Sequence, residues 1–168
     1  MKIEKVDQKI YQKHLRLLML MVVIVLCVIS IPFSALLILL IGNPEGGNML
    51  LNAIGVVVAA LLVVWLLRRY SGLPWMHEVV YVWCLKQQLN RITRKFKAVN
   101  EAAEQGERDA LIVLNFSYRG SEQLYLLDNN TITLDDLRLK ITALDAQVAA
   151  LGLDISLDDY REELLKQY

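Results

Sequence analysis

His77 and Cys84 are side chains capable of metal or acid–base chemistry, and they lie seven residues apart in one stretch of the chain. That spacing places both on one face of a helix. A metalloprotease helix needs a second His at position 81, where this chain has Tyr81. Because two ligands without a third hold a metal ion poorly, we expect His77 to be a packed or interfacial residue and no metal to bind.

The polar stretch "DNNTITLDDL", residues 128–137, has the alternate oxygen side chains of a calcium-binding loop. Such a loop needs Gly at its sixth position and Glu at its twelfth, and these are Thr133 and Leu139 here. We interpret the stretch as a polar turn followed by a helix cap. The sequence also lacks a Gly-rich phosphate-binding loop and a Ser nucleophile motif. We therefore expect no catalytic residue, no cofactor and no small-molecule substrate.

Basic side chains gather near residue 95. Nucleic acid is a poor partner for them, because residues 100–168 carry fourteen acidic and six basic side chains and would repel phosphate. Two interpretations remain open: the bases contact anionic lipid while aromatic rings lie at the headgroup level, or the bases pair with the acidic helices that follow. The residues for either contact are Trp75, Tyr81, Trp83, Arg91, Arg94, Lys95 and Lys97.

Two long uncharged runs indicate that the chain crosses a membrane. Residues 17–41 and 49–67 contain no Asp, Glu, Lys or Arg, and about 20 helical residues cross the hydrocarbon core of a bilayer. The connecting segment 42–48, "GNPEGGN", is rich in turn formers. We therefore predict a hairpin of two transmembrane helices, in a chain that is 55% hydrophobic with a mean hydropathy of +0.38.

Basic residues predict the orientation of this hairpin. The N-terminal segment 1–16 carries five Lys or Arg, Arg68 and Arg69 follow the second span, and the segment 42–48 carries none. Short segments rich in Lys and Arg stay in the cytoplasm. Both termini should therefore be cytoplasmic and the connecting turn external.

Small residues occur at matching levels of the two predicted spans. In an antiparallel hairpin, Ser30 falls level with Ala59, and Ser34 falls level with Gly55. Small residues one helical turn apart let helix backbones approach closely in lipid. We predict that these four residues form a transmembrane packing seam.

After a linker at 68–74, residues 75–168 predict a small cytoplasmic domain of about four helices. The first helix should run from Trp75 to about Glu104, and the others should span about 107–127, 134–150 and 157–167, with Gly106 and Gly152 just past two of the ends. Apolar side chains at alternating steps of three and four predict a packing seam on the first helix. Its residues are Val82, Leu85, Leu89, Ile92, Phe96, Val99 and Ala103. The predicted fold class is an all-α membrane protein.

Two resemblances add to this reading. The stretch "AAEQGERDALIVLNFSYRG" (102–120) resembles one Sel1-type, tetratricopeptide-like repeat, through Gly106, Ala110, Leu114 and Tyr118. Because no second copy follows at a suitable period, we interpret the stretch as a tight helical hairpin with a surface suited to protein docking.

The whole chain resembles the bacterial inner-membrane proteins of domain of unknown function 3087. The resemblance rests on "YQKHL", "PWMHEVVYVWCLKQQLNRI", "AAEQGERDAL", "DNNTITLDDL" and "LGLDISLDDYREELL". It implies two spans, a helical cytoplasmic tail and no known activity. We therefore expect a non-enzymatic inner-membrane protein whose cytoplasmic helices dock onto a second copy or another membrane or cytoplasmic protein. The alternative is a lipid-binding or sensory module that uses the helix at 75–97.

Overall fold

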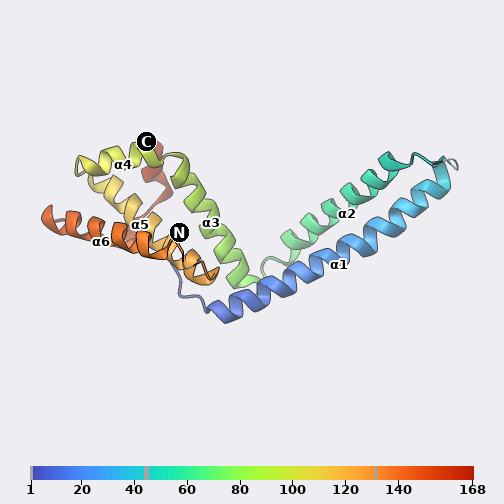
Figure 1. Ribbon diagram of the computed structural model, residues 1–168, viewed down its shortest axis with the longest axis horizontal. Helices are drawn as coiled ribbons and strands as arrows, with labels where there is room; N and C mark the ends of the chain where they lie inside the picture. The colour runs from blue at the N-terminus through green and yellow to red at the C-terminus, as the bar shows by residue number, and fades with distance from the viewer. Residues whose placement is uncertain (1, 44–45, 131) are drawn as a thin grey trace. The chain divides into compact units, whose positions relative to one another are not determined.

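The computed structural model describes residues 2–43, 46–130 and 132–168, and every regular element within these ranges is helical (Figure 1). The all-α prediction is therefore confirmed for the described residues. The chain divides into two compact units. We call Lys13–Val79 the hairpin unit, and we call Met1–Gln12 together with Val80–Tyr168 the helical unit.

The hairpin unit is built from two antiparallel helices, α1 (Gln8–Ile41) and α2 (Met49–Tyr70), which Figure 1 shows in blue and teal. Both are long and apolar enough to cross a membrane. α1 begins at Gln8, well before the uncharged run that starts at residue 17, and α2 continues through its basic residues to Tyr70. A short 3-10 helix, η1 (Pro74–Met76), follows.

The single long helix predicted from Trp75 to Glu104 is wrong, because two helices occupy this range. α3 (His77–Arg94) and α4 (Phe96–Glu104) are separated by Lys95, which belongs to neither helix. The Lys95 amide donates to the carbonyl of Ile92, three residues back, which tightens the chain out of α-helical geometry. Since no Gly or Pro stands here, packing of α4 against α5 explains the break better than local propensity does.

α5 (Arg108–Leu127) is the central helix of the helical unit, and α4, α6 (Leu134–Ala150) and the two C-terminal 3-10 helices all contact it. Residues 110–117 are consequently buried on every face of the helix. The predicted bounds of α6 are confirmed. Gly106 and Gly152 adopt φ of +80° and +64° just past α4 and α6, a left-handed conformation that a Gly adopts without steric cost.

The fourth helix predicted at 157–167 is also wrong. Two short 3-10 helices, η2 (Leu157–Asp159) and η3 (Glu162–Gln167), replace it, with extended backbone between them at Tyr160 and Arg161. The Ser156 side chain and Asp159 form a capping box at the start of η2. The helix stops there because the extended backbone lets the Tyr160 ring enter the core, where it is 3% exposed.

Candidate functional site

α3 has one face toward the core and one toward solvent. Its buried residues are Tyr81, Val82, Leu85, Gln88, Leu89 and Ile92. Trp83 lies on the other face and is 61% exposed. Trp83, Cys84, Gln87, Gln88 and Arg91 line a surface hollow of about 210 Å³. A large exposed aromatic beside an Arg is typical of protein contact surfaces, where Trp and Arg supply much of the binding energy.

The predicted packing seam lies on α3 and α4. Six of its seven residues are buried, and Phe96, directly after the break, is half-buried with its ring centroid 6.5 Å from that of Tyr118 on α5. Because the chain breaks at Lys95, the residues of the seam are divided between α3 and α4, and both helices pack into the core.

A second hollow, of about 270 Å³, lies between the end of α3 and the C-terminal segment. Its lining residues are Arg91, Arg94, Lys95, Glu162, Leu165 and Lys166. Arg91 Nη1 pairs with Glu162 Oε1, and Lys95 Nζ donates to the Leu165 carbonyl at 2.6 Å. We call this the basic hollow.

The C-terminal segment is held by buried contacts on both sides of Tyr160. Its ring stacks on Phe116 of α5 with centroids 3.9 Å apart, and its hydroxyl accepts a 2.6 Å hydrogen bond from Gln88 Nε2 on α3. Burial raises the pKa of the Tyr160 hydroxyl. These contacts fix the wall of the basic hollow that Glu162 and Lys166 provide.

The N-terminal residues pack on the helical unit and cap the end of α5. Gln8 Nε2 donates to the carbonyl of Leu126 at 2.5 Å, and Gln12 Nε2 donates to that of Leu127 at 3.0 Å. The last carbonyls of a helix have no partner within it. The first turns of α1, where Gln8 and Gln12 lie four residues apart on one face, supply those partners.

Two further contacts attach this N-terminal segment. Tyr11 is 3% exposed, and its hydroxyl lies 3.4 Å from Asp128 Oδ1, which belongs to a carboxylate that also pairs with Lys86 at 2.8 Å. Farther along, Tyr81 accepts a hydrogen bond from the Glu4 amide and donates to Gln123 Oε1. Burial raises the pKa of both tyrosine hydroxyls.

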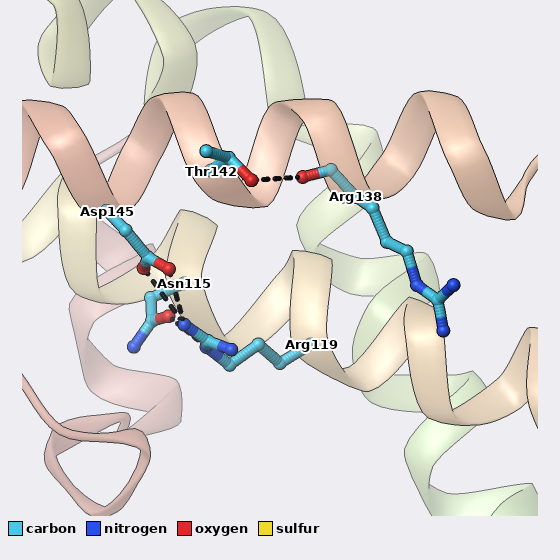
Figure 2. Close-up of polar contacts among 5 residues, drawn as sticks. All are labelled: Asn115, Arg119, Arg138, Thr142 and Asp145. Atoms are coloured by element: carbon cyan, nitrogen blue, oxygen red, sulfur yellow. Dashed lines mark hydrogen bonds and ion pairs between the residues drawn. The ribbon is translucent and has the colours of Figure 1, made fainter.

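α5 and α6 are joined by a polar network (Figure 2). Arg119 Nη2 lies 2.9 Å from both Asp145 oxygens, and its Nε donates to the buried Asn115 at 3.0 Å. Arg138, whose carbonyl accepts from Thr142 in the same view, pairs through its Nε with Glu122. Since each of these cations has an anionic partner within the fold, the network holds helices together and leaves no charge available for a ligand.

In the hairpin unit, the predicted small residues lie where α1 and α2 are in close contact. A Cβ on Gly55 would collide with Ser34 Oγ and lie 3.1 Å from the Ser30 carbonyl oxygen. Ala59 is fully buried. Near the other end of the unit, His14 Nδ1 lies 3.1 Å from Glu78 Oε2, and the His14 ring meets Trp75 edge-on. Hydrogen bonding to its own backbone amide, and then to His14, lowers the pKa of Glu78 despite partial burial.

The residues predicted for lipid or acidic contact have different environments. Tyr81 is buried, so its ring is unavailable to lipid headgroups, whereas Trp83 is exposed. Arg91 pairs with the acidic C-terminal segment, and Lys97 pairs with Glu101 on its own helix at 3.9 Å. Arg94 is exposed on the rim of the basic hollow.

Cys27 and Cys84 are both free thiols, exposed and half-buried respectively. Within 2–43, 46–130 and 132–168, no group of three or more His, Cys, Asp or Glu is placed to hold a metal ion. His77 lies at the start of α3 and is exposed.

Sequence reasoning missed Lys166, Tyr160 and the capping glutamines. Gln8 and Gln12 have a recognisable four-residue spacing, but their partners lie more than a hundred residues away. Lys166 offered no local signal, because its position in the same hollow as Arg94 depends on the path of the chain after Tyr160.

A family model described as "Protein of unknown function (DUF3087)" matches residues 1–165. No curated protein and no solved structure matches the chain.

Proposed function

Because the chain belongs to the DUF3087 family, whose description names no activity, we propose a function from its own residues. We infer that it is a two-span protein of the bacterial inner membrane with both termini in the cytoplasm. Its helical unit then acts as a non-enzymatic docking module at the membrane surface.

Exposed apolar surface supports the membrane part of this proposal. Val28 and Ile31 on α1 are 61% and 66% exposed, and Leu61 on α2 is 65% exposed. A helix in the core of a soluble protein would bury such side chains, since each square ångström of apolar surface in water costs about 25 cal/mol. A bilayer removes that cost along the whole length of both helices.

The capping of α5 supports termini on one side. Gln8 and Gln12 at the start of α1 bond to α5, and α5 follows α2 in the chain. Because α1 and α2 are antiparallel, residue 13 at the start of the hairpin unit and Tyr70 at the end of α2 lie at the same end of that unit. The Lys and Arg residues of these ends favour the cytoplasmic side.

Exposure of Trp83 is the observation that carries the docking role. A protein partner would bury its ring and use Gln87 and Arg91 beside it for polar contacts. A membrane collar fits less well, because Tyr81, which would be part of it, is buried. The partner is a second copy of the chain or another membrane or cytoplasmic protein.

Photo-crosslinking in intact cells tests this proposal. A benzophenone side chain at position 83 should form a protein adduct of one defined mass. That mass is twice the mass of the chain for a second copy, or the mass of the chain plus that of one partner protein. The matched control is position 139 on α6, since Leu139 is 70% exposed and lies outside both hollows. Adducts with lipid alone at position 83, or equal protein adducts at both positions, would contradict a docking role.

A further inference from the structure

The basic hollow gathers more positive charge than the fold compensates. Four cationic side chains line it, and Glu162 is the single carboxylate among its lining residues. Glu162 is paired with Arg91. Lys95 is bonded to a neutral carbonyl, which leaves its charge in place. Side chains of Arg94 and Lys166 form no hydrogen bond or ion pair with the residues that the structure describes.

The end of α3 accounts for only some of the positive charge in the basic hollow. Arg91 and Arg94 lie in the last turn of α3, where a positive charge is favoured by the exposed carbonyls. Lys166 belongs to η3, in the C-terminal segment, which is far from α3 in the sequence but lines the same hollow. Like charges brought together repel one another, so their convergence from two segments needs another source of compensation.

Part of the wall of the basic hollow is held in place by packing, and its cations are of the kind that bind oxyanions. Leu165 is 5% exposed and packs into the core, and the adjacent Lys95–Leu165 bond is 2.6 Å long. Arg94 stands three residues after Arg91, on the same helical face. Guanidinium groups donate paired hydrogen bonds to tetrahedral oxyanions, and a Lys ammonium adds a compact charge.

We propose that the basic hollow is a binding site for a phosphate-bearing anion, with Arg94 and Lys166 as its principal contacts. The phosphate belongs to a soluble phosphorylated compound or to the headgroup of an anionic lipid. The basic hollow shares Arg91 with the hollow beside Trp83, but the two principal contacts, Arg94 and Lys166, line the basic hollow alone.

Two binding measurements on the full chain distinguish the sources. In nanodiscs of phosphatidylcholine, calorimetric titration with inorganic pyrophosphate reports a soluble ligand. In mild detergent, native mass spectrometry reports how much phosphatidylglycerol the chain retains relative to phosphatidylcholine. Saturable binding of pyrophosphate, or retention of phosphatidylglycerol in preference to phosphatidylcholine, supports the site and identifies its source. The absence of both would overturn it.

Substitutions then locate the site. Arg94→Gln with Lys166→Gln should weaken binding by about tenfold or more, because two charge-assisted contacts are lost. Lys97→Gln with Lys140→Gln is the matched control: it removes the same charge from exposed residues outside the hollow and should change the affinity by less than about twofold. Glu162→Gln should strengthen binding, since it removes the carboxylate and releases Arg91. Equal weakening by the two double variants would show a general charge effect and reject the site.

Discussion

The side-chain amide of Gln88 donates a 2.6 Å hydrogen bond to the hydroxyl of Tyr160, and both residues are buried. They lie on α3 and on the extended backbone between η2 and η3. This bond, with the stacking of Tyr160 on Phe116, attaches a C-terminal segment that has only two short 3-10 helices of its own.

Tyr160→Phe tests that attachment. The ring can still stack, but Gln88 loses its acceptor in a buried position, so the free energy of unfolding should fall by about 1–3 kcal/mol. Urea unfolding of the full chain in mild detergent, followed by near-ultraviolet circular dichroism, measures it. Tyr125→Phe is the control, because the Tyr125 side chain is half-buried and bonds to no described residue. Equal losses in the two variants would contradict the role of the Gln88 bond.

Alkaline pH should destabilise the helical unit. Burial raises the pKa of Tyr11, Tyr81, Tyr118 and Tyr160, and burial together with Glu107 raises the pKa of Tyr168 to about 12. A raised pKa means that the folded chain holds the phenolic proton more tightly than the unfolded chain does. Stability is therefore unaffected below the ordinary value of about 10 and falls as the pH rises from about 10 toward 12.

Phenolate absorbance measures this effect directly. The folded chain should titrate at higher pH than the same chain in urea, and the free energy of unfolding should decline over the same interval. Superimposable titration curves for the two states would contradict the burial of these hydroxyl groups.

Gly55→Ala tests the close contact of α1 and α2 at this position. The added Cβ collides with Ser34 Oγ, and overpacking of this kind costs about 1–3 kcal/mol. Unfolding by sodium dodecyl sulfate in mixed micelles should therefore require less denaturant for this variant. Ser34→Gly in the same chain should restore stability, because it removes the obstructing side chain.

Gly72→Ala provides the control for that experiment, since nothing lies within 4 Å of a Cβ at Gly72. Its unfolding curve should match that of the unaltered chain. An unchanged curve for Gly55→Ala as well would show that the two helices are not packed at this point.

Removing the glutamine caps should loosen the end of α5. Gln8→Ala with Gln12→Ala leaves two carbonyls without their side-chain donors, at a cost of about 0.5–1.5 kcal/mol for each bond. Hydrogen exchange should accelerate at the backbone amides of residues 124–127. Gln105→Ala, at an exposed position with no side-chain bond in the described part of the chain, should leave those rates unchanged. Identical exchange in both variants would contradict the capping role.

Local patterns predicted the fold where the cause was local. The apolar period and the Gly after it predicted α6, and Gly106 predicted the end of α4. The break at Lys95 was not predictable in this way, because no helix-breaking residue stands there and the contacts that accompany it involve Leu165 and α5.

The candidate site could be predicted from the sequence only in the part where its residues are neighbours in the chain. Arg91, Arg94 and Lys95 form a cluster in the sequence, whereas Lys166 joins them only because Tyr160 leaves helical geometry to bond with Gln88. A contact between residues so far apart leaves no periodic pattern in either segment. Side-chain partners of this kind require the structure.

The central claim is tested most directly by measuring on which side of the membrane the turn between α1 and α2 and the helical unit each lie. Single cysteines are introduced at Gly46, in the turn between α1 and α2, and at Ile132, which is 90% exposed in the helical unit, after Cys27 and Cys84 are replaced by Ser. A membrane-impermeant maleimide on intact cells should label the cysteine at position 46 and reach position 132 only after lysis. Labelling of position 132 in intact cells, with position 46 protected, would contradict the proposed topology and the docking role that depends on it.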